Sequence, residues 1–153
     1  LGIESEDGTE FVENAREQVE EFGVTIHEEE VTSVEETAEG FAVETAAETE
    51  AGEAAETTAG DQTHEGSYLV LATGADRSLA ESLNCDFTDE DIVDVGVSME
   101  TSVADAYATG AMVRAEEWQA IISAGDGAAA ALNILSKEKG EHFHDFDVPA
   151  DAE

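Results

Sequence analysis

The chain has 153 residues, a length typical of one domain, and carries 39 acidic residues against five Lys and Arg, a formal net charge of −34. Because apolar residues still make up 41% of it, this acidity indicates a folded protein from the cytoplasm of an extreme halophile rather than disorder. The same charge disfavours DNA, RNA and anionic membranes as partners, and no stretch is apolar for long enough to cross a membrane.

The first part of the chain predicts one helix followed by a three-stranded β-meander. Apolar residues recur at helical spacing from Phe11 to Phe22, and Gly23 ends the helix. Short β-rich runs predict strands at 24–27, 31–35 and 41–45. The stretch 46–66, rich in Ala, Glu, Thr and Gly, is expected to form a long acidic loop with a solvated His64 at its end.

The second part predicts two short strands and a long helix. Residues 67–74 form the most hydrophobic strand, whose continuous apolar run predicts burial on both faces. One helical turn is expected at 78–83, an irregular extended segment at 91–99 and a buried strand from Ala106. A helix follows from Trp118 to Ser136 and ends at Gly140. Its apolar or small stripe comprises Trp118, Ile121, Ile122, Gly125, Ala129 and Leu132.

Two glycines inside the long helix indicate a close neighbour. Gly125 and Gly127 each cost about 1 kcal/mol relative to alanine, so the helix is expected to lie very close to a sheet or a ligand. Since unpaired N–H groups point out of a helix start, the preceding strand, its glycine turn and this helix predict a site for an anion or an oxygen-rich ligand.

Two strand ends, Leu71-Ala72-Thr73-Gly74-Ala75 and Ala108-Thr109-Gly110-Ala111, precede the helix sequence that runs from Trp118 to Leu132. Together these motifs resemble the FAD-binding part of the thioredoxin-reductase-like branch of the pyridine-nucleotide disulfide oxidoreductases, over nearly the whole chain. The resemblance implies an α/β, FAD/NAD(P)-binding Rossmann-like three-layer fold with a parallel sheet plus a three-stranded meander. Residues 1–140 would form this FAD-binding-like domain, with 141–153 as a polar tail.

The resemblance also implies a set of residues around a non-covalently bound FAD. These are Val31, Ala72, Thr73, Gly74, Gly110, Ala111, Trp118, Gln119 and Ala120. Val31 would face the adenine, and Gln119 and Ala120 would lie under the pyrimidine edge of the flavin. A helix start there would stabilise the negative charge of reduced flavin by up to about 1–2 kcal/mol. Trp118 would either stack near the flavin or simply pack.

The sequence departs from the family pattern at four points. It lacks the Gly-x-Gly-x-x-Gly turn that seats the pyrophosphate, which indicates an incomplete beginning, and it has Ala111 where the family has an aspartate that holds the ribityl chain. Met112, Val113 and Arg114 either replace those contacts or form a plain surface connection. No NADPH domain or NAD(P)H site is visible. With one cysteine, Cys85, the chain has no dithiol pair.

Without its first strand the fold would leave an open hydrophobic edge at 68–73, so we expect a homodimer or a second chain to cover it. The predicted function is FAD-dependent electron transfer in a high-salt cytoplasm. The alternative is a catalytically silent flavin-fold module that acts in dimerisation or partner binding. No catalytic residue is predicted, and no metal site is expected, because His142 and His144 lack a third placed ligand.

Overall fold

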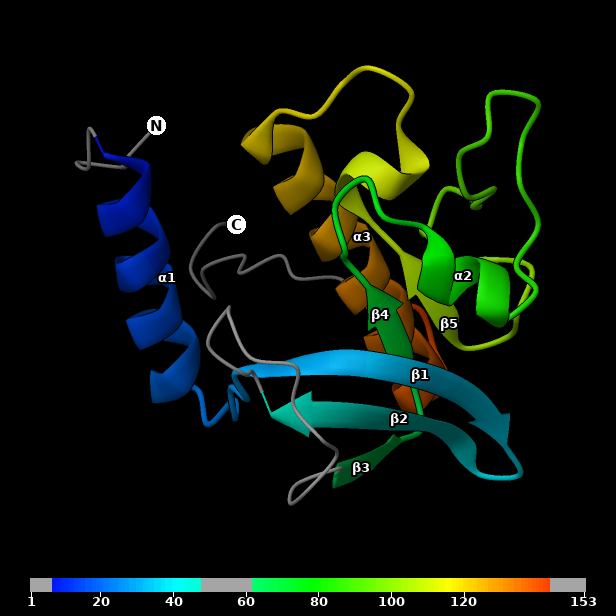
Figure 1. The fold of residues 1–153 in the computed structure, drawn as a ribbon, viewed down its shortest axis with the longest axis horizontal. Helices are drawn as coiled ribbons and strands as arrows, with labels where there is room; N and C mark the ends of the chain where they lie inside the picture. The colour runs from blue at the N-terminus through cyan, green and yellow to red at the C-terminus, as the bar shows by residue number, and fades with distance from the viewer. Residues whose placement is uncertain (1–6, 48–61, 144–153) are drawn as a thin grey trace, which may run out of the picture.

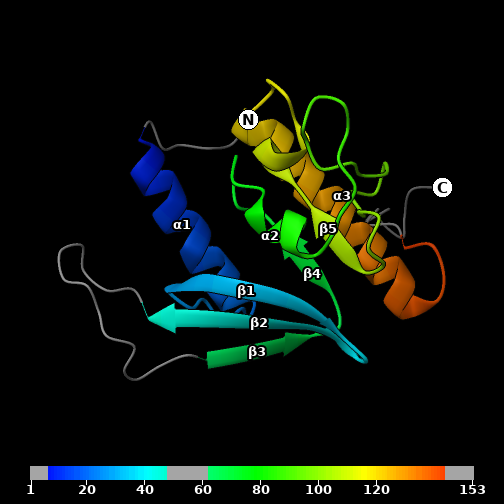
Figure 2. The same ribbon diagram turned by 45° about the vertical axis from the view of Figure 1, so that its right-hand side comes forward.

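The structure is a computed structural model that describes residues 7–47 and 62–143. It is a mixed α/β fold with one antiparallel and one parallel sheet (Figures 1 and 2). Its elements in chain order are α1 (Gly8–Glu21), β1 (Glu29–Thr37), β2 (Gly40–Ala47), β3 (Gln62–Gly66), β4 (Leu69–Leu71), α2 (Ser78–Ser82), β5 (Ala106–Ala108), the 3₁₀ helix η1 (Gly110–Val113) and α3 (Ala120–Lys139). No helix among these residues has the length and apolar character needed to cross a bilayer.

The expected three-stranded meander is present, in the order β1-β2-β3 with antiparallel pairing throughout. A two-residue turn joins β1 to β2, and the pairing register shifts between Val31 and Ser33. Gly40 follows the turn with φ of +138°, and a Cβ there would lie 2.2 Å from the carbonyl oxygen of Gly66. The close approach of β3 to the hairpin therefore requires glycine at this position.

The observed meander differs from the predicted one in one strand that is absent and one that was predicted as loop. Residues 24–27 form no strand and instead connect α1 to β1. Gln62–Gly66, expected as the end of the acidic loop, is the third strand and pairs with β2 from Thr45↔Gln62 to Phe41↔Gly66. This segment has no apolar residue, so the hydrophobic pattern that usually marks a strand is absent from its sequence. Residues 48–61 of the expected loop lie outside the described part of the chain.

The parallel pair β4–β5 has the register Leu69↔Ala106 to Leu71↔Ala108. All three residues of β5 are buried, as predicted, but β4 is not covered on both faces, because Val70 remains 45% exposed. Within residues 7–47 and 62–143, no strand pairs with the other edge of β4. The described residues thus leave one edge and part of one face of this sheet open.

The core lies where the meander, the parallel pair and α3 meet. Tyr107 of β5, Met112 of η1 and Val93 are its largest completely buried side chains, and Val34 and Phe41 contribute from the meander. The Tyr107 hydroxyl donates a hydrogen bond of 2.6 Å to the Asn133 side chain of α3.

The expected helical turn after β4 is α2, whose Ala80 is completely buried. The extended segment expected at 91–99 is irregular and forms only an isolated bridge, between Phe87 and Val93.

Helix α3 turns a different face to the core from the one predicted. Asp126, Ala130, Asn133 and Lys137 lie at helical spacing on the side that contacts η1, β5 and the loop before it. The predicted stripe lies about a quarter turn away. It is largely exposed, with Ile121 at 70%. Hydrogen-bonded polar residues therefore hold α3 to the body together with the buried Ala130, and much of the predicted apolar stripe faces outward.

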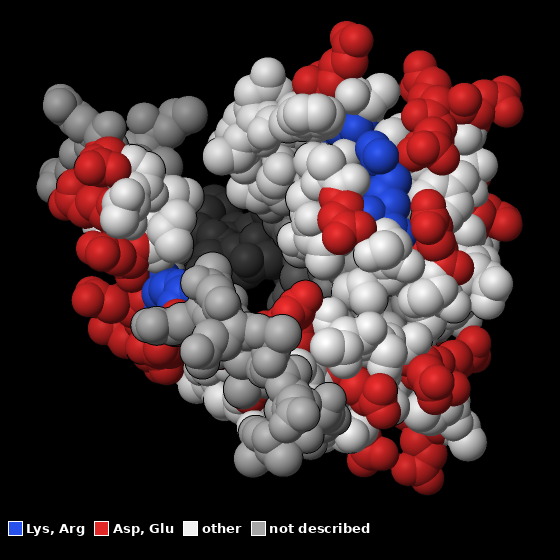
Figure 3. All heavy atoms as spheres, viewed as in Figure 1, with Lys and Arg blue, Asp and Glu red and all other residues white. Residues whose placement is uncertain are grey.

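Helix α1 stands apart from the rest of the molecule (Figures 1 and 3). Asp7 is its N-cap, and the Asp7 side chain accepts a hydrogen bond from the Thr9 N–H. None of its residues is buried, although apolar residues recur at helical spacing along it. An ion pair between Arg16 and Glu28 ties it to the segment before β1.

Lys137 holds the end of α3 to the loop that precedes β5. Its Nζ lies 2.5 Å from Glu100 Oε1, 2.7 Å from Asp105 Oδ1 and 5.6 Å above the Tyr107 ring. Burial opposes its charge, but hydrogen bonds to Asp105 and Glu100 raise the pKa of Lys137 above its usual range. One cation thus bridges two carboxylates from the same loop.

We predict that Lys137→Met lowers the free energy of unfolding by about 1–2 kcal/mol, because it leaves Glu100 and Asp105 facing each other without a cation. Urea denaturation in KCl measures this, and the loss should shrink as KCl rises and screens the two carboxylates. Lys139→Met, which removes a cation from the same helix turn, is the matched control and should cost less. Equal losses for the two variants would contradict the role of Lys137.

Candidate functional site

The carboxyl ends of β4 and β5 and the start of α3 lie at the same end of the molecule (Figures 1 and 2). Ala72–Gly74 follow β4, Gly110 and Ala111 follow β5 in η1, and Gln119 and Ala120 open α3. In open α/β sheets ligands bind at this end of the strands. The structure therefore brings eight of the nine predicted cofactor residues to one end of the fold.

The first glycine corner, Ala72–Gly74, is exposed. The Thr73 hydroxyl donates a hydrogen bond of 2.6 Å to the backbone carbonyl of Asp76, which closes the turn. Gly74 has φ of +69°, and no atom lies within 4 Å of the position that a Cβ would occupy. This corner therefore presents backbone to open space.

The second corner packs against α3. Gly110 has φ of +72° and is buried, and a Cβ there would lie 3.3 Å from Ser123 Oγ. The completely buried Met112 follows, and its Sδ lies 3.9 Å from the Thr73 hydroxyl. Met112 thus connects the first corner to η1, and Gly110 connects η1 to α3.

The start of α3 is open to solvent. Gln119 is its N-cap, but its side chain makes no capping hydrogen bond, and Gln119 and Ala120 are exposed. Trp118 is 57% exposed, and its Nε1 donates a hydrogen bond of 3.2 Å to the Arg114 carbonyl. This contact fixes one edge of the indole and leaves much of the ring uncovered.

Met112, Val113 and Arg114, which could have replaced the ribityl contacts of the family's aspartate, already have partners within the fold. Met112 and Val113 belong to the core. Arg114 donates to both carboxylate oxygens of the buried Asp126, and this hydrogen bonding raises the pKa of Arg114. Ala111 offers only a methyl group. Position 111 therefore offers no side-chain oxygen that could accept a hydrogen bond from a ribityl hydroxyl.

Val31, the ninth predicted residue, lies in a different part of the fold. It belongs to β1 in the meander, where it pairs with Thr45 and is 39% exposed. The meander lies below the parallel pair in Figure 1, away from the end that carries the two corners.

Three cavities border residues other than Ala72–Gly74 and the start of α3. Two, of about 390 and 350 Å³, border the β1–β2 turn, and one of about 420 Å³ lies between Ile92 and residues 113–117. None of these three is lined by residues 72–74 or 119–120. Residues 72–74, 119 and 120 are exposed at the surface.

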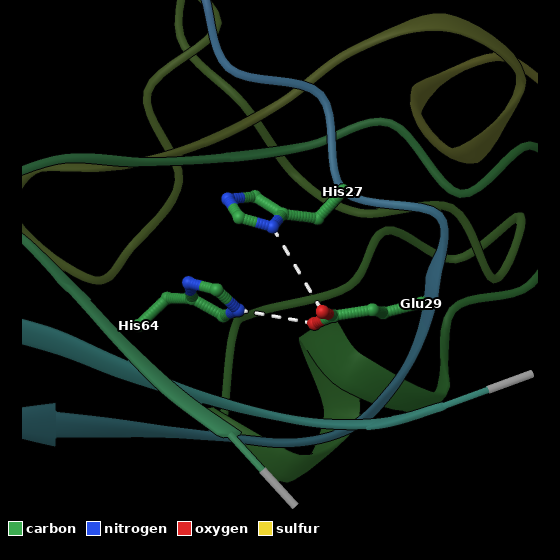
Figure 4. Close-up of side chains that lie close together, drawn as sticks. All are labelled: His27, Glu29 and His64. Atoms are coloured by element: carbon green, nitrogen blue, oxygen red, sulfur yellow. Dashed lines mark hydrogen bonds and ion pairs between the residues drawn. The ribbon is translucent and has the colours of Figure 1, made fainter. Parts of the chain in front are cut away.

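A second cluster of polar side chains lies on the meander (Figure 4). His27 Nδ1 lies 3.8 Å from Glu29 Oε1, and His64 Nε2 lies 3.1 Å from Glu29 Oε2. Hydrogen bonds from the Thr45 hydroxyl and from His64 lower the pKa of Glu29. The cluster joins the segment before β1 to β3, across β2.

Sequence reasoning missed this cluster because it treated His64 as a solvated loop residue. His64 instead lies in β3, half-buried, with its ring centroid 4.5 Å from that of His27. His27 and Glu29 lie two residues apart in the sequence and so can share one face of an extended segment. The strand that carries His64 has no apolar residue, however, so nothing in the sequence placed His64 beside them.

Comparison with known proteins bears on the fold. No known protein-family model matches the sequence, and no curated protein matches it. A crystal structure of a ferredoxin-flavin thioredoxin reductase from Clostridium acetobutylicum is similar over 92% of this chain and 82% of that one, with 15% identity and a TM-score of 0.69. The chain therefore has a thioredoxin-reductase-like fold.

A second solved structure, a thioredoxin reductase from Gloeobacter violaceus, is 24% identical over 44% of this chain, with a TM-score of 0.40. The matched region spans 24% of that reductase. The similarity to the Clostridium acetobutylicum structure confirms the resemblance read from the sequence at the level of the fold, and membership of the FAD/NAD(P) family and the Rossmann-like layering stay predictions.

Cys85, the single cysteine of the chain, is a core residue. It is 6% exposed, and burial raises the pKa of its thiol. A thiol that is protonated and covered is a poor nucleophile.

We predict that iodoacetamide alkylates Cys85 in the native protein at least tenfold more slowly than in urea, because native burial both covers the thiol and keeps it protonated. Mass spectrometry of timed samples measures the two rates. Equal rates would contradict the placement of Cys85 in the core.

Two glycine substitutions should have opposite effects on stability. Gly110→Ala should lower the free energy of unfolding by about 1–2 kcal/mol, since alanine is strained at positive φ and its methyl would crowd Ser123. Gly125→Ala should raise it by about 0.5–1 kcal/mol, because the position is helical and no described atom lies within 4 Å of a Cβ there. Urea denaturation of both variants checks the signs, and a loss at Gly125 would show that something packs on this face.

Proposed function

We propose that this chain is the flavin-binding part of a thioredoxin-reductase-like, FAD-dependent oxidoreductase. The observation that carries the proposal is the similarity to a ferredoxin-flavin thioredoxin reductase over 92% of the chain. At the end of the fold where such a ligand would bind, the first glycine corner and the uncapped start of α3 are both exposed.

The described residues suit one end of FAD better than the other. The open corner at Ala72–Gly74 leaves room for a flat ring, and the N–H groups at Gln119 and Ala120 favour negative charge at its pyrimidine edge. The second corner lacks a ribityl acceptor because position 111 is alanine. Bound flavin would supply the electron transfer, while these residues bind and orient its ring.

The surface near this end of the fold suits contact with a second copy of the chain or with another protein. The outward stripe of α3, including Ile121 and Gly125, carries no charge in a chain of net charge −34, and β4 has an open edge beside the exposed Val70. Charge-free surface of this kind marks contact sites. We propose that a second copy or another chain covers the edge at 68–73, in a high-salt cytoplasm.

The alternative is a catalytically silent flavin-fold module that acts in dimerisation or partner binding. Ala111 in the place of a ribityl-binding aspartate favours it, as does the predominance of uncharged surface on α3. In that case the same open edge would still bind a partner, but no flavin would be retained.

A thermal melt in multimolar KCl with and without FAD distinguishes the two functions. Binding at one hundred times the dissociation constant should add about 2.7 kcal/mol to the free energy of unfolding. Ala120→Trp should abolish this gain, because its side chain would fill the surface at the start of α3. Since Ala120 is exposed, the variant should unfold like the wild type when FAD is absent.

Ala131→Trp is the matched control. Ala131 is also exposed on α3 but lies about 16 Å further along the helix, so this variant should keep the FAD-dependent gain. A wild-type melt that FAD does not change would overturn the flavin proposal and favour the silent module.

A further inference from the structure

His27, Glu29 and His64 come from three segments and meet at one end of the meander (Figure 4). His27 lies in the connection that follows α1, Glu29 is the first residue of β1, and His64 lies in β3. All three offer a ligand atom within 4.8 Å of the others. This cluster is separate from the two glycine corners and from the flavin proposal.

The spacing of the three ligand atoms is close to that of a zinc site. Zinc bonds of about 2.0–2.1 Å in tetrahedral geometry place neighbouring ligand atoms roughly 3.3–3.5 Å apart. His64 Nε2 lies 3.1 Å from Glu29 Oε2 and His27 Nδ1 lies 3.8 Å from Glu29 Oε1, and the three residues offer ligand atoms within 4.8 Å of one another. Small side-chain rotations would bring all three atoms onto one ion.

The surrounding residues hold the carboxylate in place. The Thr45 hydroxyl donates to Glu29 Oε2, and the Gln62 amide donates to Oε1 over 3.1 Å. Thr45 is 5% exposed, so the floor of the cluster is buried while His27 and His64 stay partly open. Hydrogen bonds that orient a ligating side chain in this way are typical of metal sites.

A proton-mediated ion pair explains only part of this arrangement. His64 and Glu29 could pair through one proton, but His27 approaches the other oxygen of the same carboxylate, and its ring is tilted 49° to that of His64. Two imidazoles around one carboxylate are the ligand set of a borderline metal ion, whereas Mg²⁺ and Ca²⁺ prefer oxygen alone. The net charge of −34 would also raise the local concentration of divalent cations.

We propose that His27, Glu29 and His64 bind one Zn²⁺ ion, with a fourth position left to water. The ion would fasten the segment before β1 to β3 across β2 and so close one end of the meander. Since His27 follows α1 in the chain, the ion would also fix the point from which α1 departs.

The test is a zinc titration of the metal-free protein against a chromogenic chelator in multimolar KCl, with excess Mg²⁺ present to occupy the acidic surface. The wild type should bind one equivalent of Zn²⁺. His27→Ala, Glu29→Gln and His64→Ala should each weaken that binding at least tenfold, and zinc should raise their melting temperatures less than that of the wild type. His142→Ala, which changes a histidine outside the cluster, is the matched control and should bind like the wild type.

His27→Ala keeps the proposal falsifiable if the other variants fold poorly. It leaves the hydrogen bonds of Glu29 to Thr45, Gln62 and His64 intact, so its circular dichroism should match the wild type. Unchanged zinc affinity in a folded His27→Ala variant would overturn the proposal. So would zinc binding that is lost in His142→Ala, or a wild type that does not bind zinc under these conditions.

Discussion

The chain has only five lysine and arginine side chains to offset the mutual repulsion of 39 acidic residues. Four of these five cations connect two different segments of the fold. Arg16 ties α1 to the segment before β1, Arg77 donates to the Met112 carbonyl of η1, Arg114 pairs with Asp126 of α3, and Lys137 joins α3 to the loop before β5. The fifth, Lys139, lies over the ring of Phe143. Because repulsion between carboxylates acts everywhere on the surface, the fold depends on these few attractive contacts being at the junctions between elements.

Helix α3 shows both what the sequence predicted and what it could not. Its presence, its glycine end and the buried strand before it follow from local patterns, and Gly140 indeed has the left-handed φ of +67°. Its orientation does not, because the side that contacts the body is held by Asp126, Asn133 and Lys137, each with a specific partner. Hydrophobic periodicity cannot detect a face of that kind, since it ranks such residues as solvent-exposed.

The candidate sites differ in the same way. The two glycine corners could be predicted because a turn with positive φ restricts the residue type, and Gly74 and Gly110 both have such a φ. Their shared position followed from the resemblance to a known fold rather than from periodicity. The cluster around Glu29 could not be predicted, since it depends on the register Val43↔His64 between β2 and β3, and the sequence does not mark β3 as a strand. Pairing across a sheet is non-local, and one residue of slip would turn His64 to the other face.

The scarcity of cations has a consequence for how this protein resists proteolysis. Trypsin cleaves only after lysine and arginine, so the chain offers it five positions, and each of these side chains is engaged in a contact of the native fold. The residues that join the elements are thus also the only sites of attack. Digestion by trypsin therefore reports directly on whether these junctions are closed, and a nick at one of them removes the contact that protected it.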